Sequence, residues 1–211
     1  SLLLLIGTIA FFALEFSNTM EHLNVGEKVI ASIFQSTNTR TAGFASIDIA
    51  AENDITKMLT ILLMFIGGSP GSTAGGIKVT TFIVIFSTVL SSMRGKEDAS
   101  FLGHRFDKKI VYKSLAVIGL SLMLIVIDLG VILFFNKPGG ALDILLEATS
   151  AFGTVGLSAS LTPKLNLLGK LMIMLTMFIG RVGPASLGIA ILMKPRRGSE
   201  SILPEGRMLV G

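Results

Sequence analysis

Four apolar runs in the sequence most constrain the fold, because they favour helices that cross a membrane. The hydrocarbon core of a bilayer is about 30 Å thick, and a helix needs about 20 apolar residues to cross it. The composition agrees, since the chain is 51% hydrophobic and 15% charged, with a mean hydropathy of +0.75. Backbone polar groups in lipid must be satisfied internally, and the apolar pattern does not alternate, so we expect an all-α integral membrane protein. The runs are residues 2–14, 58–90, 111–135 and 165–193.

The first run begins at the first residue of the chain, Ser1, with no initiator methionine and no charged segment before it. This start is typical of a helix that has been cut short, so we expect a fragment rather than a signal peptide. The chain contains no cysteine, which excludes disulfides and thiolate metal sites.

The distribution of charge predicts the orientation in the membrane. Residues 93–113 contain six lysines and arginines, and the tail after Met193 contains four more. Residues 15–57 contain six acidic side chains against three basic ones. Cytoplasmic loops carry the excess of lysine and arginine, so the first two segments are predicted inside and the third outside. The net charge of +4 is therefore a topology signal, and we expect no nucleic-acid partner.

An internal repeat organises the chain. The letters MFIG start at Met64 and again at Met177, and the related letters TAGF and TVGL start at Thr41 and Thr154. Both pairs are 113 positions apart, which indicates a duplication. We predict one repeat over residues 1–93, a cytoplasmic loop at 94–110, a second repeat over 111–193 and a cytoplasmic tail at 194–211.

Each repeat contains a short apolar segment, at residues 26–37 and 141–151, which is predicted to be a re-entrant helix. Such a helix is too short to span the bilayer, and its C-terminal end carries partial negative charge that favours a cation. A Thr-x-Gly loop follows each one, and its glycine permits backbone conformations that aim carbonyl oxygens at one axis. Rings of carbonyls select K⁺ in channels, so two copies in register favour a filter over two tight turns. The predicted K⁺ filter residues are Thr41, Ala42, Gly43 and Phe44, with Thr154, Val155, Gly156 and Leu157.

A glycine-rich segment, residues 67–76, interrupts the second apolar run. A phosphate-binding P-loop would need lysine directly after its second glycine, whereas Ile77 follows Gly76 here. A helix-length apolar run precedes the segment instead of a buried strand. Polar, irregular backbone at membrane depth must line a cavity or be buried in protein, which favours a functional loop over a static kink.

Four stretches together resemble the Trk/Ktr/HKT superfamily of potassium transporters, and most of all the membrane subunits of Ktr systems. They read NTRTAGF, FGTVGL, GGSPGSTAGG and FIGRVGPASL. The resemblance implies four helix–pore-helix–helix repeats around one K⁺ path, of which this chain matches the last two. It further implies a missing N-terminal half of the same pore, a homodimer, and a cytosolic ring of nucleotide-binding RCK subunits. The implied location is the plasma membrane.

The resemblance also implies a gate below the filter, formed by the glycine-rich segment and by an arginine that projects into the pore. The small residues suit a flexible backbone, and the hydroxyls could meet passing ions or water. Carried onto this sequence, the gate residues are Gly67, Gly68, Ser69, Pro70, Gly71, Ser72, Thr73, Ala74, Gly75, Gly76 and Arg181.

Three further charges lie within or beside the predicted spans. We expect Arg40 to point behind the filter towards an acid, because a cation in the pore would repel K⁺. Asp128 is expected to be buried and hydrogen bonded, and Lys78 either to reach the cytoplasmic interface or to contact loop carbonyls.

The alternative function is a secondary solute transporter built from discontinuous helices, which would favour inverted rather than parallel repeats. An enzyme is not expected, because the sequence shows no nucleophile–base or paired-carboxylate pattern.

Overall fold

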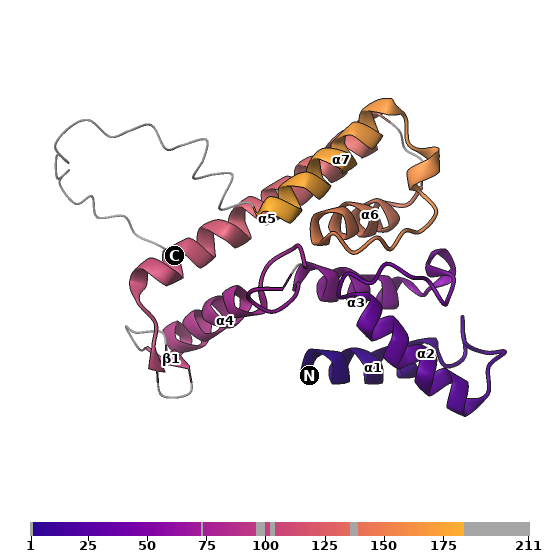
Figure 1. The fold of residues 1–211 in the computed structure, drawn as a ribbon, viewed down its shortest axis with the longest axis horizontal. Coiled ribbons are helices and arrows are strands. Elements are labelled where there is room, and N and C mark those ends of the chain that lie inside the picture. Colours follow the sequence, from indigo (N-terminus) through magenta and orange to yellow (C-terminus); the bar gives the residue numbers. More distant parts are fainter. Residues whose placement is uncertain (1, 73, 96–99, 102–103, 136–138, 184–211) are drawn as a thin grey trace.

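The structure is a computed structural model that describes residues 2–72, 74–95, 100–101, 104–135 and 139–183. These residues are almost entirely helical, which confirms the predicted all-α class, apart from one small hairpin (Figure 1). The α-helices are α1 (Leu2–Glu15), α2 (Val25–Asn38), α3 (Asp54–Phe65), α4 (Val79–Met93), α5 (Lys108–Phe135), α6 (Ala141–Gly153) and α7 (Leu167–Val182). Two 3₁₀ turns, η1 (Ile49–Ala51) and η2 (Thr162–Lys164), and the hairpin strands β1 (Ser100–Phe101) and β2 (His104–Arg105) complete the fold.

Local sequence explains where two of these helices begin. Asn24 precedes α2, and the carboxylate of Glu27 accepts a hydrogen bond of 2.9 Å from the Asn24 backbone N–H, which forms a capping box. Asn166 precedes α7, and its side chain accepts a hydrogen bond of 2.8 Å from the Gly169 backbone. Both caps satisfy N–H groups that the first turn of a helix leaves unpaired.

Only α5, among the described residues, is long and apolar enough by itself to cross a bilayer. Its 28 residues extend over about 42 Å at 1.5 Å per residue. The run at 58–90 is divided between α3 and α4, and the run at 2–14 lies in the shorter α1. The run at 165–193 is helical in α7 as far as Val182, and its remainder, like the tail at 194–211, lies outside the described residues.

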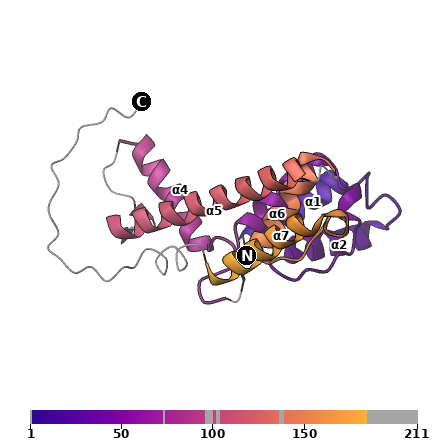
Figure 2. The same ribbon diagram turned by 90° about the horizontal axis from the view of Figure 1, so that it is seen from above.

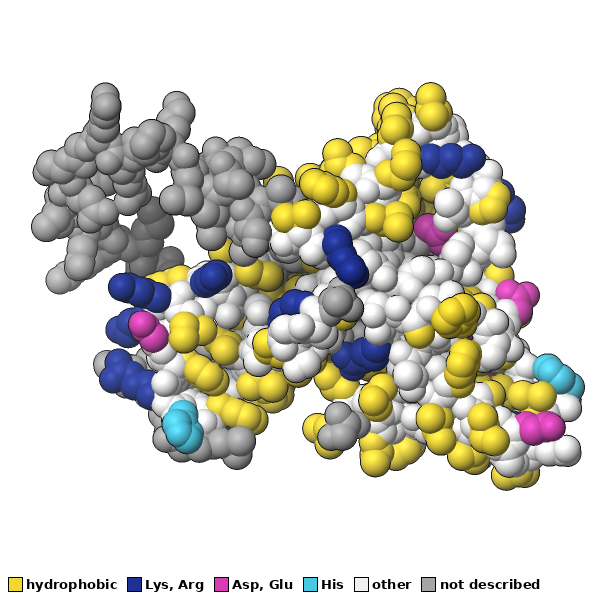
Figure 3. Space-filling view, in the orientation of Figure 1, with side chains coloured by type: hydrophobic (Ala, Val, Ile, Leu, Met, Phe, Trp, Pro, Cys, Tyr) yellow, Lys and Arg dark blue, Asp and Glu magenta, His cyan; other side chains and the backbone are white. Residues whose placement is uncertain are grey.

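The two parts of the chain run in the same direction. In Figure 1, α1 and α5 both run from left to right along the chain, and α3 and α7 both return from right to left. Lys and Arg side chains gather at the left end, near the connection from α4 to α5, and acidic side chains lie mostly towards the right (Figure 3). The corresponding helices of the two parts therefore run in parallel directions.

The spacing of 113 residues found in the sequence also appears in the backbone. The 3₁₀ turns begin at Ile49 and Thr162, and the helices that follow them begin at Asp54 and Leu167. Each pair differs by 113 positions. The two parts thus keep one register from the Thr-x-Gly loops to the helices after them.

Helix α6 lies at the centre of the molecule and has α3, α5 and α7 packed around it (Figures 1 and 2). The side chains of Ile144, Leu146 and Phe152 are fully buried there. Phe152 packs with Ile77 and Ile125, so one cluster joins α6, α5 and the residue after the glycine-rich segment. The second Thr-x-Gly loop directly follows α6, so it extends from a helix that three other helices hold in place.

The repeated MFIG motif ends in a glycine because backbone from elsewhere approaches at both positions. A Cβ atom on Gly67 would overlap the Gly75 carbonyl oxygen, and one on Gly180 would overlap the Phe152 carbonyl oxygen. Neither position can accept a side chain without movement of the backbone.

We predict that Gly180→Ala destabilises the protein, because the added methyl group pushes α7 away from the end of α6. Overpacking of this kind typically costs about 1–3 kcal/mol. The thermal midpoint in detergent, followed by the loss of the monodisperse peak in size-exclusion chromatography, measures the effect. Gly130→Ala on α5 is the matched control, because a methyl group there would have no neighbouring atom of this chain within 4 Å. A thermal midpoint of Gly180→Ala equal to that of the control would contradict the packing argument.

Candidate functional site

The first Thr-x-Gly loop (residues 41–44) and the second (residues 154–157) share an unusual backbone. Thr41 has φ of +76° and Gly43 of +73°, while Thr154 has +51° and Gly156 has +91°. In each loop the residue between them, Ala42 or Val155, does not have a positive φ. Positive φ is costly for a threonine, so its occurrence at matching positions marks a constrained site. When φ alternates in sign along a segment, successive carbonyl groups can point to the same side of the backbone.

The two loops meet each other although they are 113 residues apart in sequence. A Cβ atom placed on Gly43 would lie 2.7 Å from the Val155 carbonyl oxygen, and one placed on Gly156 would lie 3.4 Å from the Gly43 Cα. The backbones of the two loops therefore face each other with no side chain between them. At Gly43 both the close approach and the positive φ favour glycine, whereas at Gly156 the positive φ does.

The glycine-rich connection (residues 67–76) joins α3 to α4 and folds back on itself at its base. The Gly67 N–H donates to the Ile77 carbonyl over 2.8 Å, and the Ile77 N–H donates to the Phe65 carbonyl over 3.2 Å. Its two ends are thus fastened together, which makes the connection a closed loop rather than an extended linker. The predicted interruption of the apolar run is present in the backbone.

The C-terminal end of the glycine-rich connection lies against the second Thr-x-Gly loop. The Gly75 N–H donates to the hydroxyl of Thr154 over 3.2 Å. A Cβ atom on Gly75 would lie 2.6 Å from that hydroxyl oxygen and 2.9 Å from the Gly153 carbonyl oxygen. The structure therefore brings together residues of the predicted filter and residues of the predicted gate. Thr73 falls outside the described residues.

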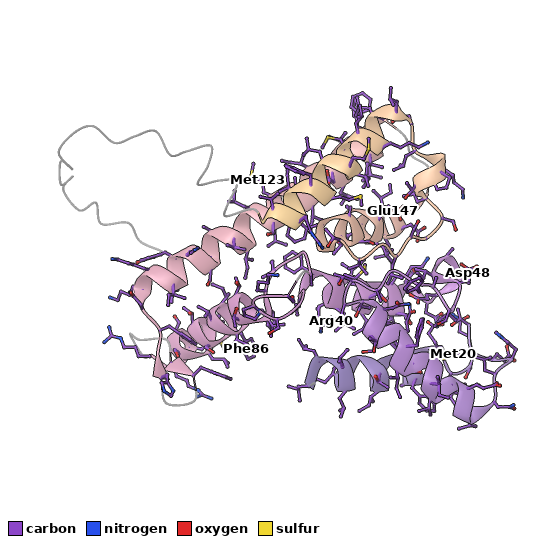
Figure 4. The ribbon with its side chains drawn as sticks, in the orientation of Figure 1. Met20, Arg40, Asp48, Phe86, Met123 and Glu147 are labelled. Atoms are coloured by element: carbon purple, nitrogen blue, oxygen red, sulfur yellow. The ribbon has the colours of Figure 1, made fainter. Side chains whose placement is uncertain are left out.

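Arg40 corrects one expectation. Among the described residues its guanidinium pairs with no acid; Nη1 donates to two backbone carbonyls, those of Ile66 and Gly67, over 2.8 Å each. In Figure 4, Arg40 lies beside the end of α3, where the glycine-rich connection begins. The acceptors are backbone carbonyls rather than a carboxylate: Ile66 caps α3 and Gly67 follows it, so both oxygens lie just beyond the helix end, where the partial negative charge of the helix favours a cation.

The other three charged residues of the sequence analysis, Lys78, Asp128 and Arg181, lie at separate places in the fold. Lys78 contacts loop carbonyls, because its Nζ donates to the Ala74 oxygen over 2.7 Å and the Ser72 oxygen over 3.1 Å. Asp128 is fully buried and accepts a hydrogen bond of 2.5 Å from Thr176, which confirms the expected packing role. Arg181 lies in the last turn of α7, directly after Gly180, and its predicted contact with the glycine-rich connection stays a prediction.

A buried polar cluster behind the first Thr-x-Gly loop escaped the sequence analysis. Asn38 accepts a hydrogen bond of 3.2 Å from the Phe44 N–H, which ties the loop to the end of α2. One turn earlier, the Gln35 amide donates to Glu52 over 2.8 Å. The sequence signal for this cluster is the change from apolar to polar residues along the last turn of α2. That change identifies the polar residues but not the groups to which they bond.

The second loop has an acidic residue behind it as well. Glu147 on α6 accepts hydrogen bonds from Ser158 over 2.9 Å and from the Thr162 hydroxyl. It borders a hollow of about 240 Å³ between α6, α7 and the second loop, which Gly156 and Ile173 also line. In the first turn of α6, Asp143 forms an ion pair of 2.8 Å with Lys57 of α3. This ion pair joins the two parts of the chain.

Comparisons with known proteins agree with this architecture. The family model described as "Cation transport protein", TrkH, matches residues 2–201. The chain is 39% identical over 208 residues to the Ktr system potassium uptake protein B of Bacillus subtilis, covering 98% of this chain and 46% of that relative. It is 36% identical over 215 residues to the potassium/sodium uptake protein NtpJ of Enterococcus hirae, covering 99% of this chain and 48% of that relative.

A solved structure has the same fold. The crystal structure of the potassium transporter TrkH from Vibrio parahaemolyticus superposes with a TM-score of 0.73 at 18% identity, covering 92% of this chain and 43% of that chain. This chain therefore spans about half the length of the relatives it matches.

Glu52, in the segment between α2 and α3, generates a pH prediction. Burial raises its pKa to about 7, and the nearby Glu15 carboxylate adds to the rise, while Gln35, Lys57 and Thr60 oppose it. An unfolded chain loses this proton near its ordinary pKa of 4.5, whereas the folded protein keeps it. The resulting stabilisation is complete below about pH 4.5 and is lost as the pH rises through 7.

We therefore expect the thermal midpoint to fall between about pH 5 and pH 8, and Glu52→Gln to remove part of that fall. The effect is at most roughly 3 kcal/mol, at about 1.36 kcal/mol for each unit of pKa shift. Thermal midpoints in detergent across this pH range provide the measurement, with the exposed Glu21→Gln as the control. A fall that is equally steep in Glu52→Gln and in the parent would show that Glu52 does not titrate in this range.

Proposed function

The chain belongs to the TrkH family of cation transport proteins, and from that premise we propose that it forms half of a K⁺-conducting pore in the plasma membrane. The observation that carries the proposal is the pair of facing Thr-x-Gly loops. Their backbones have the same alternation of φ, at positions 113 residues apart, and they approach each other closely. Potassium uptake by relatives of about twice this length, and the parallel direction of the two parts, support a pore over an inverted-repeat transporter.

The proposed filter uses backbone oxygen atoms rather than charged side chains. Carbonyl oxygens can replace the hydration shell of K⁺ when several of them point at one axis. The alternation of φ at residues 41–43 and 154–156 supports that arrangement. Helices α2 and α6 end just before these loops, so the partial negative charge of each helix end lies nearest the ion. Thr41, Ala42, Gly43 and Phe44 form one wall, and Thr154, Val155, Gly156 and Leu157 form another.

Two walls cannot enclose an ion, and the exposed surface of α2 supports a missing N-terminal half of the same pore. A stripe along α2 is apolar and exposed in this chain, with Ile30 at 69% and Val25 at 63% exposed. The corresponding helix α6 is covered by three neighbours, and α2 packs chiefly against α1. A helix that ends at membrane depth needs protein around it, so the preceding half is expected to cover this stripe. The stripe contains Val25, Val29, Ile30, Ile33 and Phe34.

The glycine-rich connection is proposed to gate the path. It starts at the end of α3, closes on itself at its base, and contacts Thr154 at the start of the second loop. Residues 68–72 between these anchor points bear exposed or half-buried small side chains, and Gly71 has φ of +81°. Arg181 is proposed to brace the connection from α7. Small movements of such a loop would open or close the space below the filter.

The cytoplasmic surface is proposed to bind a regulatory partner. Lys and Arg side chains gather around the connection from α4 to α5, including Arg94, Lys108 and Lys109 (Figure 3). The resemblance to Ktr membrane subunits supports a homodimer on a cytosolic ring of nucleotide-binding RCK subunits, with this basic surface as the docking face. Relatives named as Ktr system proteins support the same assembly. Flux of K⁺ against Na⁺ through the complete transporter in liposomes tests the proposed function directly.

We predict that Gly43→Ser and Gly156→Ser lower the preference for K⁺ over Na⁺, because a Cβ atom strains the positive φ at both positions and, at Gly43, also lies 2.7 Å from the Val155 carbonyl oxygen. Backbone strain of about 1–3 kcal/mol corresponds to roughly a five- to hundredfold loss in selectivity if the filter bears it alone. Flux ratios in liposomes measure the change. Gly26→Ser at the start of α2 is the control, because nothing lies within 4 Å of its Cβ position. Unaltered ion discrimination in both filter variants would remove the filter assignment.

We predict that deleting residues 71–75 raises K⁺ flux in the absence of the cytosolic regulator, and that Arg181→Gln does so more mildly. Loss of charge-assisted hydrogen bonds between Arg181 and the connection would remove about 1.5–3 kcal/mol from the closed state. That bias shifts a two-state gate by about ten- to a hundredfold. Lys170→Gln, which removes one exposed charge from the same helix, is the control. A deletion variant that folds, reaches the membrane and conducts no faster than the parent refutes the gate.

A further inference from the structure

Arg40 connects the first Thr-x-Gly loop to the glycine-rich connection. It directly precedes Thr41, the first residue of the loop, and its Nη1 donates to the carbonyls of Ile66 and Gly67 over 2.8 Å each. Ile66 caps the end of α3, and Gly67 is the first residue of the connection. One side chain therefore joins the residue before the predicted filter to the base of the predicted gate.

Both ends of this link are held firmly. The Arg40 N–H donates to the Thr37 carbonyl over 3.0 Å, and the Ala42 N–H donates to the Asn38 carbonyl over 3.4 Å, so the backbone around Arg40 is tied to α2. At the other end, the Gly67 N–H is paired with Ile77, which fixes the base of the connection. Arg40 therefore makes a direct contact between the backbone that leads into Thr41 and the base of the connection.

The guanidinium also has an electrostatic effect at this point. It places a positive charge beside the Ile66 and Gly67 carbonyls, just beyond the end of α3, where the helix carries partial negative charge. A cation at the adjacent first loop would be repelled by this charge. A cation bound at the first loop and the position of the guanidinium therefore influence each other.

Within the described residues, the second Thr-x-Gly loop has no arginine link of this kind. The residue 113 positions after Arg40 is Gly153, and a Cβ atom there would lie 3.0 Å from the Met64 carbonyl oxygen. The second loop instead contacts the connection through the Thr154 hydroxyl and Gly75. The two loops thus contact the first and the last part of the connection, which lie side by side at its base, and, of these two described contacts, that of the first loop uses a charged side chain.

We propose that Arg40 is a positioning residue that couples cation occupancy of the first Thr-x-Gly loop to the conformation of the glycine-rich connection. The inference rests on the proposed function, since it assumes that a cation binds between the loops. Coupling is reciprocal: the factor by which K⁺ shifts the connection equals the factor by which the connection shifts K⁺ affinity. A brace with a purely structural role would stabilise the protein without making the connection respond to K⁺.

The test follows the connection with a chemical reporter in the complete transporter. This chain has no cysteine, so Ser69→Cys places a single thiol in it, on an exposed residue two positions after Gly67. The rate of reaction of that thiol with a maleimide is measured in K⁺ and in a large organic cation at equal ionic strength. Any cysteine contributed by the other half is first replaced by serine.

We expect K⁺ to change the labelling rate of the parent reporter by about fivefold or more, the lower end of ordinary coupling. Arg40→Gln is expected to abolish this K⁺ dependence, and Arg40→Lys to restore part of it, because lysine keeps the charge but bonds as a single point. Lys28→Gln is the matched control, since Lys28 is likewise a cation bonded to a backbone carbonyl, that of Phe16, and is itself buried. Its K⁺ dependence should equal that of the parent.

Two results overturn the inference: a labelling rate that does not respond to K⁺ in the parent, or an equal response in Arg40→Gln. Flux separates this outcome from failure of the gate. If deletion of residues 71–75 speeds flux while Arg40→Gln leaves the K⁺ response intact, the gate stands and the coupling falls. If the deletion does not speed flux but Arg40→Gln abolishes the K⁺ response, the coupling stands and the gate falls.

Discussion

Irregular backbone at the depth of a membrane must be covered by protein, because lipid offers no hydrogen bonds to unpaired N–H and C=O groups. The structure meets this requirement by stacking its irregular segments on one another. The glycine-rich connection lies against the second Thr-x-Gly loop through Gly75, and the two Thr-x-Gly loops meet at Gly43 and Gly156. At Gly43 and Gly75 the backbones approach so closely that they leave no space for a Cβ atom. The functional proposals all concern this stack.

The two parts of the chain share a register but differ in how they are used. After the first loop, α3 stops at Phe65 and the glycine-rich connection follows, whereas α7 continues past the corresponding position to Val182. Arg40 occupies a position that Gly153 holds in the second part. These differences place one irregular connection between two loops, so the site is asymmetric although its parts are related.

Polar contacts behind the loops give the site its rigidity. Asn38 accepts a hydrogen bond from the Phe44 N–H, and Glu52 accepts one from the Gln35 amide. Glu147 accepts hydrogen bonds from two hydroxyl groups. Buried hydrogen-bonded groups of this kind are costly to leave unpaired, so they fix the geometry of the backbone that they touch. The ion pair between Lys57 and Asp143 adds a connection between the two parts at their outer end.

The sequence by itself determined the helical class, the repeat spacing, the interruption of the second apolar run and the residues of both Thr-x-Gly loops. These follow from local patterns: apolar runs, repeated letters and clustered glycines. Only the tertiary structure decided the partners, such as the contact of Gly75 with Thr154 and the two carbonyls that receive Arg40. The expectation of an acid near Arg40 was wrong because a pattern of side chains does not reveal backbone carbonyls, and the end of α3 supplies them. The physical reason is that periodicity records which residues are apolar, while close approach between segments depends on how helices far apart in the chain pack around α6.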